Sequence, residues 1–207
     1  LQTLFDHSDV EILYVVSQPD RPSGRGNKLK SPEVIELAKS LGLKTFQTQN
    51  INKEIDFLHQ LDSLNPDLFI VFAFAQFLGK RVLSLPRLGC FNIHTSLLPL
   101  YRGAAPIHYA VLNADKQTGV SIQRMVKKMD AGDICCDSTI SISTDETTET
   151  LYVKLKSLAS TLLSDFIKSA GNNSLCFKQQ DETKASFAPT IKKEEGYIDF
   201  TLENAAT

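Results

Sequence analysis

Short apolar runs alternate with amphipathic stretches along the first half of the chain. The apolar runs are continuous and rich in β-branched and aromatic residues, which predicts strands over 10–17, 44–46, 67–74 and 88–93. Between them, apolar residues recur at helical spacing, which predicts helices between 31 and 42, over 52–63 and over 80–85. This alternation of strands and helices favours an α/β fold with a doubly wound, mostly parallel sheet.

Turn-forming residues set the limits of the first of these helices. We expect Ser31 to be its N-cap, Pro32 to occupy its first helical position and Gly42 to end it. The preceding stretch, 18–30, is rich in Pro and Gly and therefore predicts a loop.

The second half of the chain has a different order of elements. A helix is expected over 106–114, and the polar residues of two strands over 118–126 and 134–142 indicate a partly exposed antiparallel addition to the sheet. The stretch 147–170 predicts a long amphipathic helix, ended by Gly171-Asn172, with one apolar face made of Leu151, Leu155, Leu158, Leu162 and Phe166.

The two ends of the sequence differ from its middle. The opening residues, LQTLFDHSD, predict a helical remnant, whereas a doubly wound domain usually starts on a strand, so we expect a further N-terminal β-strand that this sequence lacks. Residues 186–207 indicate a linker that leads to another part of the protein.

Composition and charge restrict the function to a globular protein without a general affinity for nucleic acid. The 207 residues are 42% hydrophobic and 22% charged, and the net charge is −2. Binding of nucleic acid therefore needs a local patch, and the loop over 18–30 supplies one, since it sets Arg21, Arg25, Lys28 and Lys30 against a single acidic residue, Asp20. No apolar run approaches the length of a membrane span, and we expect a monomer that does not associate with membranes.

The four cysteines do not predict a metal or redox site. Cys90, Cys135, Cys136 and Cys176 lack the C-x-x-C spacing of zinc and dithiol motifs. Reduced thiols in a cytosol-like compartment are expected.

One stretch, FNIHTSLLPLYRGAAPI over 91–107, is not explained by packing. Asn92 and His94 are two residues apart at the end of a predicted strand, so both side chains leave the same face, at the edge where α/β sheets bind ligands. An amide and an imidazolium can both donate to a developing oxyanion, and a carboxylate such as Asp130 can fix the imidazole tautomer. These groups suit attack of an external amine on a carbonyl.

Other readings of the same residues stay open at this point. A histidine at a strand end is often only a structural hydrogen bonder, and Asp133 competes with Asp130 as the carboxylate. A serine hydrolase is disfavoured because no G-x-S-x-G motif is present, and a metal site is disfavoured because one histidine with scattered carboxylates is not a ligand set. Arg102 could bind phosphate, orient its loop or cap a turn.

The motif N-I-H-x-S-L-L-P (92–99) with D-A-G (130–132) resembles the folate-dependent formyltransferase superfamily. The segments SLLPLYRGAAPI (96–107) and SQPDRPSGRGNKL (17–29) are similar to the branch of that family that acts on methionyl-initiator tRNA. The resemblance implies a Rossmann-like formyltransferase fold, with a catalytic domain over 1–185, a linker over 186–207 and a C-terminal β-barrel domain after it.

The same resemblance implies an activity and its reactants. A formyl group would pass from 10-formyltetrahydrofolate, without a metal, to the amine of initiator Met-tRNA, in the cytoplasm or in an organelle. Asn92 and His94 would stabilise the oxyanion, and Asp130 would hold His94 protonated and help to move protons.

Binding residues are also implied by the resemblance. The folate segments would be Phe74, Ala75, Gln76, Phe77 and Leu78, and then Ser96, Leu97, Leu98 and Pro99. The tRNA contacts would be Arg21, Arg25, Lys28 and Lys30. The sequence departs from the family pattern at Phe74-Ala75, where Tyr-Gly is expected, and at Gly79, where a proline is expected.

Two alternative functions remain. One is another 10-formyltetrahydrofolate-dependent enzyme, either a transferase acting on glycinamide ribonucleotide or an amino-sugar nucleotide, or a hydrolase. The other is a non-catalytic RNA-binding domain on the same fold, which the retained Asn92, His94 and Asp130 argue against.

Overall fold

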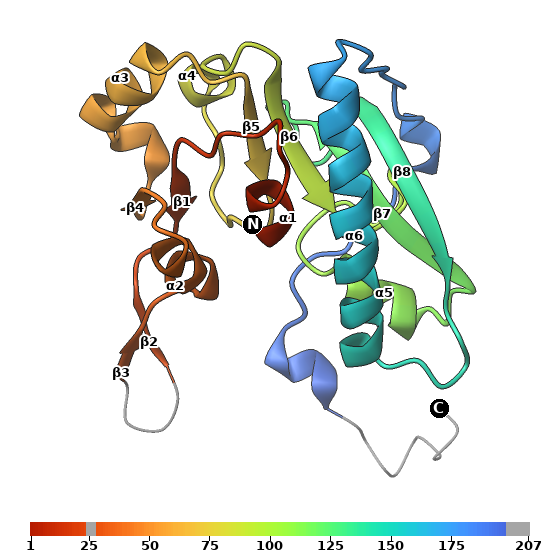
Figure 1. Cartoon of the computed structure of the whole chain (residues 1–207). Coiled ribbons are helices and arrows are strands. Elements are labelled where there is room, and N and C mark those ends of the chain that lie inside the picture. Colours follow the sequence, from red (N-terminus) through yellow and green to blue (C-terminus); the bar gives the residue numbers. More distant parts are fainter. Residues whose placement is uncertain (24–27, 198–207) are drawn as a thin grey trace.

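The computed structural model describes residues 1–23 and 28–197 and shows helices packed around a four-stranded sheet, next to a two-stranded sheet and a two-stranded hairpin (Figure 1). Its strands are β1 (Val15–Ser17), β2 (Arg21–Ser23), β3 (Lys28–Lys30), β4 (Thr45–Gln47), β5 (Leu68–Val71), β6 (Gly89–His94), β7 (Gln117–Arg124) and β8 (Ile134–Ser141). Its α-helices are α1 (Gln2–Phe5), α2 (Glu33–Ser40), α3 (Ile55–Ser63), α4 (Lys80–Leu83), α5 (Pro106–Leu112) and α6 (Thr148–Gly171). Short 3-10 helices are η1 (Ile51–Lys53), η2 (Glu182–Lys184) and η3 (Lys193–Gly196).

The strands form parallel pairs in the first half of the chain and antiparallel pairs in the second. β1 pairs with β4 and β5 with β6 in parallel, whereas β6, β7 and β8 are neighbours in antiparallel order. The predicted α/β fold and the antiparallel addition are both confirmed. The register of β6 and β7 sets Asn92 opposite Gln123 and His94 opposite Ser121, which brings polar side chains together at one end of the sheet.

Helices cover both faces of β6, because successive residues of a strand point to opposite faces. Phe91 packs into an apolar cluster with α5 and α6, while Cys90 packs into a second cluster with α3 and α4. The predicted apolar face of α6 lies on the first cluster, where Leu151, Leu155, Leu162 and Phe166 are buried and Leu158 is partly buried. A capping box between Thr147 and Thr150 starts this helix.

Two strands are shorter than the apolar runs that predicted them. β1 starts at Val15 rather than at residue 10, because its parallel partner β4 starts opposite it, at Thr45. β5 ends at Val71 rather than at residue 74, because Ala73 takes φ +49° and Ala75 takes φ +56°. A backbone at these angles leaves the extended region, so it cannot continue a strand.

The stretch over 18–30 was expected to be a loop, and this prediction is wrong for Arg21–Ser23 and Lys28–Lys30, which are strands. β2 and β3 form an antiparallel hairpin in which Arg21 pairs with Lys30. The high Gly and Pro content of the stretch concealed strands of this length. Residues 24–27 lie outside the described part of the chain.

The start of α2 also differs from the prediction. Pro32 is the N-cap, and Ser31 is not. The Ser31 hydroxyl instead donates to Oδ1 of Asp20 at 2.8 Å. A hydroxyl that donates to a charged carboxylate makes a stronger hydrogen bond than a hydroxyl that accepts from a neutral helix N–H. The Ser31 side chain therefore turns away from the helix end and towards Asp20.

Packing onto this body continues past residue 185. Ala188 is fully buried, and its N–H donates to the carbonyl of Arg102 at 2.8 Å. The division into a catalytic domain over 1–185 and a linker over 186–207 stays a prediction, and 198–207 lie outside the described residues. Within 1–23 and 28–197, no helix combines the length and apolar character needed to cross a membrane.

Candidate active site

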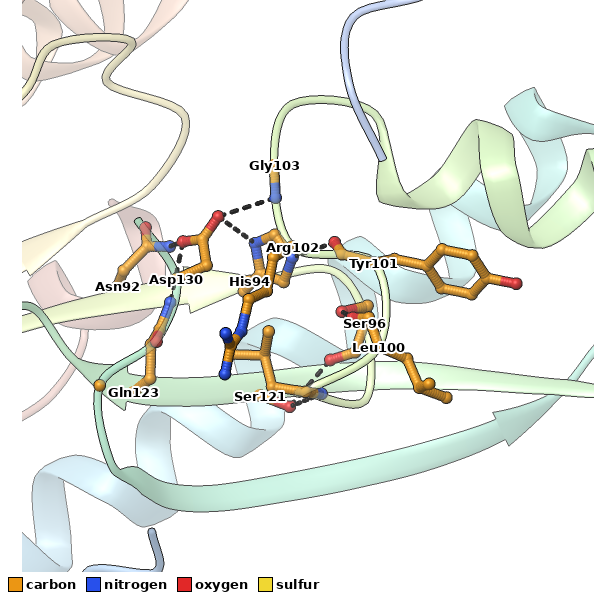
Figure 2. Close-up of polar contacts among 12 residues, drawn as sticks. Asn92, His94, Ser96, Leu100, Tyr101, Arg102, Gly103, Ser121, Gln123 and Asp130 are labelled. Atoms are coloured by element: carbon orange, nitrogen blue, oxygen red, sulfur yellow. Dashed lines mark hydrogen bonds and ion pairs between the residues drawn. The ribbon is translucent and has the colours of Figure 1, made fainter. Parts of the chain in front are cut away.

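The three predicted catalytic residues converge at the end of β6 (Figure 2). Asn92 and His94 leave the same face of the strand, and Asp130 reaches them from the connection between β7 and β8. Oδ2 of Asp130 lies 3.9 Å from Nδ1 of His94, and Nδ2 of Asn92 donates to Oδ1 of Asp130 at 3.4 Å. All three groups can therefore meet around one small carbonyl.

Two more donors fix the Asp130 carboxylate. Nε2 of Gln123 donates to Oδ1 at 2.9 Å, and the N–H of Gly103 donates to Oδ2 at 2.9 Å. The backbone of Asp130 takes φ +48°, in the left-handed region. Gly132 of the D-A-G motif is needed beside it, because a Cβ there would lie 1.7 Å from the carbonyl oxygen of Arg124.

His94 has a defined tautomer because of its second contact. Its Nε2 lies 2.8 Å from the carbonyl oxygen of Tyr101. A carbonyl oxygen accepts and cannot donate, so Nε2 carries a proton. The Nδ1 edge of the buried ring is then the one that faces Asp130.

The competing carboxylate of Asp133 lies outside this cluster of contacts. Within the described residues its side chain makes no hydrogen bond or ion pair, and its backbone carbonyl accepts from the N–H of Arg124 at 2.9 Å. The contacts of Asp130 with Asn92 and His94 thus distinguish it from Asp133.

The thiols do not offer a competing nucleophile. All four cysteines are free, and burial raises the pKa of Cys90 and of Cys135 to about 12 and that of Cys136 to about 11. These three thiols are therefore neutral near pH 7. In the described part of the chain, no group of three His, Cys, Asp or Glu side chains is placed to hold a metal ion.

The first predicted folate segment, 74–78, follows β5 and is largely engaged within the protein. The side-chain amide of Gln76 accepts from the N–H of Ile51 at 2.8 Å and donates to the carbonyl of Thr48 at 2.7 Å. Leu78 is buried, whereas Phe77 is 60% exposed. The Gln76 and Leu78 side chains therefore shape the loop, and Phe77 is its exposed aromatic residue. Two of the loop's carbonyls, those of Phe74 and Phe77, accept from the side chains of Gln18 and Asn52 at 3.0 and 2.7 Å.

The second predicted folate segment, 96–99, follows β6. Ser96 is fully buried, and its hydroxyl donates to the carbonyl of Leu100 at 2.6 Å. The N–H of Leu98 donates to the hydroxyl of Ser121 at 3.1 Å, and the Leu98 side chain is also buried. These contacts set the path of the loop, and Leu97 and Pro99 are its partly exposed members.

Two of the four predicted tRNA-binding residues face each other on the hairpin. Arg21 and Lys30 are exposed and directly opposite across the β2–β3 pair. Like charges in this position destabilise a hairpin, and the exposed pair of Lys30 with Glu33, at 3.8 Å, offsets little of that cost. Arg25 and the side chain of Lys28 lie outside the described residues.

An open hollow adjoins these two charges at the carboxyl end of β1. It has a volume of about 450 Å³ and is lined by Gln18, Pro19, Arg21, Pro22, Lys30, Ser31, Pro32, Glu33, Ala73 and Ala75. Asn92, His94 and Asp130 do not line it. The hairpin and the loop after β5 thus share one concave surface that carries the positive charges of Arg21 and Lys30.

Several residues around the site were not found from the sequence. Gln123 and the backbone of Tyr101 contact Asp130 and His94, and Gln180 approaches Asp130 from far along the chain. Arg102, whose role the sequence left open, is 1% exposed and bonded to protein groups, so it is not a phosphate ligand. Asn92 and Gln123 lie directly opposite each other on β6 and β7. A predicted pairing of these two strands could therefore have indicated that Gln123 lies at the site.

Comparisons with known proteins point in one direction. The family model described as "Formyl transferase" matches residues 2–167. A methionyl-tRNA formyltransferase of Thermotoga neapolitana is 43% identical over 194 residues, which cover 93% of this chain and 61% of that protein. The methionyl-tRNA formyltransferase of Halothermothrix orenii is also 43% identical, over 201 residues that cover 97% of this chain and 63% of that protein.

This chain therefore spans less than two thirds of the length of these relatives. Among solved structures, the formyltransferase PseJ of Anoxybacillus kamchatkensis, in complex with a formamido sugar nucleotide and tetrahydrofolate, aligns with a TM-score of 0.64. The alignment covers 88% of each chain at 18% identity. That likeness shows a shared fold.

Proposed function

The chain belongs to the formyl transferase family, and from this premise we propose that it transfers the formyl group of 10-formyltetrahydrofolate to the α-amino group of methionyl-initiator tRNA. The observation that carries the proposal is the convergence of Asn92, His94 and Asp130 around one position at the end of β6. Relatives named methionyl-tRNA formyltransferase, 43% identical over nearly all of this chain, support the choice of acceptor.

The residues of the site fit attack of an amine on a formyl carbon. The reference pKa of an α-amino group is about 8, so a neutral fraction exists near pH 7. As the amine nitrogen bonds to the formyl carbon, negative charge develops on the formyl oxygen. The Asn92 amide and the Nδ1 edge of a protonated His94 are the donors that would stabilise it.

The same geometry provides a route for the proton. The amine loses a proton as the new C–N bond forms, and the bond from the formyl carbon to the folate nitrogen breaks as that nitrogen gains one. Asp130 lies between the two oxyanion donors and can accept the first proton, directly or through water. Its hydrogen bond from Asn92, at 3.4 Å, is longer than those from Gln123 and Gly103, at 2.9 Å each, so the amide can turn towards the oxyanion at little cost.

The basic hairpin supplies the contact with the nucleic acid. We assign Arg21 and Lys30, with Arg25 and Lys28 of the same hairpin, to tRNA phosphates. A polyanion would offset the repulsion between Arg21 and Lys30 that the hairpin register creates.

Folate is assigned to the segments after β5 and β6, through backbone groups and the exposed Phe77. The protein is expected to act as a monomer in the compartment of translation, which the bacterial origin of the relatives suggests is the cytoplasm. The catalytic domain would be 1–185, with a C-terminal β-barrel domain after the linker.

The test is a formylation assay with charged initiator tRNA and 10-formyltetrahydrofolate. His94→Ala and Asp130→Ala should each lower kcat by two or more decades, since loss of one oxyanion donor costs about 10²–10³ in rate and loss of a positioned general base about 10²–10⁴. His108→Ala is the matched control, because His108 is exposed on α5 and should leave the rate unchanged. Near-wild-type formylation by either site variant would contradict the assignment.

The same assay separates the alternative functions. Faster transfer to glycinamide ribonucleotide or to an amino-sugar nucleotide would identify a different acceptor. Release of formate without an acceptor would identify a hydrolase, and tRNA binding without transfer would identify a non-catalytic RNA-binding domain.

A further inference from the structure

The segment 178–188, here called the closing segment, packs against both loops that carry the candidate site. From it, the buried side chain of Gln180 points towards Asp130. Nε2 of Gln180 donates to the backbone carbonyls of Asp130 at 2.9 Å and of Gly132 at 2.7 Å. It also lies 3.3 Å from Oε1 of Gln123, whose own Nε2 donates to the Asp130 carboxylate. One amide group thus contacts the backbone and the side-chain support of Asp130.

Arg102 binds the oxygen of the Gln180 side-chain amide. Its Nε and Nη2 donate to Oε1 of Gln180 at 3.1 and 2.8 Å. Its Nη1 and Nη2 also donate to the two carboxylate oxygens of Glu182, at 3.1 and 2.9 Å. Lys128 bonds to the same carboxylate at 2.6 Å. The guanidinium is 1% exposed and its charge is paired, so it can fix which way the Gln180 amide points.

Asp130 needs such support because of its backbone. A non-glycine residue at φ +48° is strained, and it persists where the surroundings hold it. The carbonyls of residues 130 and 132, on either side of this turn, are the groups that Gln180 binds. Without that amide, nothing described holds those two carbonyls together.

The closing segment also supports His94. Tyr101, whose carbonyl fixes the tautomer of that ring, takes φ +58°. Its N–H donates to the hydroxyl of Ser186 at 2.9 Å, and the N–H of Arg102 donates to the Ser186 carbonyl at 2.9 Å. The positions of Asp130 and of His94, which face each other across the site, therefore both depend on the closing segment.

We propose that Gln180 is a positioning residue for formyl transfer, acting through Asp130, with Arg102 orienting its amide. The inference rests on the proposed function. It predicts an effect on the rate of the chemical step and not on the binding of either substrate, since Gln180 is buried beneath the loop and contacts Asp130 through its backbone.

The experiment compares kcat and KM of the protein with Gln180→Ala, Gln180→Glu and Gln179→Ala. Gln179 is the matched control, because it is the exposed neighbour on the same segment. Both Gln180 variants should lower kcat by about 10–100-fold and leave KM for Met-tRNA and for folate within about twofold, whereas Gln179→Ala should match wild type. Gln180→Glu retains an acceptor for Arg102 and nearly the same volume, so it carries the test if the alanine variant does not fold.

A double variant separates positioning from general stability. If Gln180 acts through Asp130, then adding Gln180→Ala to Asp130→Ala should lower kcat by less than a further twofold. Three results would each overturn the inference. They are a double variant whose loss in kcat is the product of the two single losses, a rise in KM in place of a fall in kcat, and full activity of Gln180→Ala. A wild-type protein that does not formylate Met-tRNA overturns the proposed function and this inference with it, while an active wild type with an equally active Gln180→Ala overturns this inference alone.

Discussion

Ala75 is a residue whose backbone angle does not suit its side chain. At φ +56° its Cβ approaches the carbonyl oxygen that follows it, a contact that glycine avoids. The family resemblance led us to expect glycine at this position, in the loop that follows β5 and lines the hollow beside the hairpin. The substitution therefore raises the free energy of the folded loop without removing any contact.

Replacing this residue with glycine should stabilise the protein. Relief of about 1–2 kcal/mol of backbone strain exceeds the 0.4–1 kcal/mol that glycine adds in unfolded-state entropy, for a net gain of roughly 0.5–1 kcal/mol. Ala75→Gly should thus raise Tm by about 1–4 °C in calorimetry. Ala104→Gly, at an exposed position whose own φ is not positive, is the control and should lower Tm. A lower Tm for Ala75→Gly would show that the loop does not bear this strain.

Functional residues could be predicted from the sequence where a motif marks them, and not where only a tertiary contact defines their role. Asn92, His94 and Asp130 were identified because their chemistry suits one site and because their motifs resemble those of a known family, and the structure brings them together. Gln180 was not identified, because its role comes from a contact with Asp130 50 positions away that only the tertiary fold creates. A buried glutamine has no sequence pattern that distinguishes it from the exposed glutamine before it.

Among the elements, length and periodicity decided what could be predicted. α6 was predicted nearly to its ends because a long apolar face is unambiguous, and a turn-forming pair follows it. The β2–β3 hairpin was missed because three-residue strands carry no detectable periodicity. Its cross-strand pair of like charges, Arg21 opposite Lys30, is a feature that pairing alone reveals.

The hairpin should control affinity for tRNA and not for folate. Arg21→Ala and Lys30→Ala should each raise KM for Met-tRNA severalfold and flatten the slope of log Kd against log salt by about 0.7–0.9, the value of one phosphate contact. Lys168→Ala is the control, since Lys168 is exposed on α6, which Figure 1 shows far from the hairpin. If KM for folate rises while KM for tRNA does not, the assignment of the hairpin is wrong.

At the scale of the whole molecule, the class of fold followed from the sequence but the polar links between distant segments did not. Apolar runs and helical stretches alternate in the order that builds parallel pairs, so the α/β fold was predictable. The closing segment was expected to be partly linker, yet Ala188 is buried and Arg102 is joined to Glu182 across 80 positions. Such pairing is set by the assembled fold and not by local composition.

The free energy of unfolding should depend on pH because of the ion pair between Arg102 and Glu182. Hydrogen bonds from Arg102 first and Lys128 second lower the pKa of Glu182 from 4.5 to about 2. The pair therefore contributes stability above about pH 4.5, and the contribution is lost as pH falls towards 2. In urea unfolding, Glu182→Gln should be less stable than wild type at pH 7, and the difference should shrink as pH falls below about 4.5.

Glu146 provides the control for this measurement. Hydrogen bonds from Lys154 and Thr150 lower its pKa to about 2 as well, but it lies before α6 and contacts no residue of the site. Glu146→Gln should show the same pH dependence of stability with an unchanged formylation rate, whereas Glu182→Gln should also lower kcat. Equal kcat for the two variants would show that the ion pair of Arg102 with Glu182 does not influence catalysis.

The contact between Tyr101 and Ser186 joins groups 85 positions apart, and this has a consequence for protein synthesis. Ribosomes make the chain from its N-terminus, so Asn92, His94 and Asp130 all emerge before the residues that anchor their loops. A nascent chain interrupted before residue 186 holds every group that the chemistry requires, yet it lacks the hydrogen bonds that orient them. We expect such truncated products to be inactive.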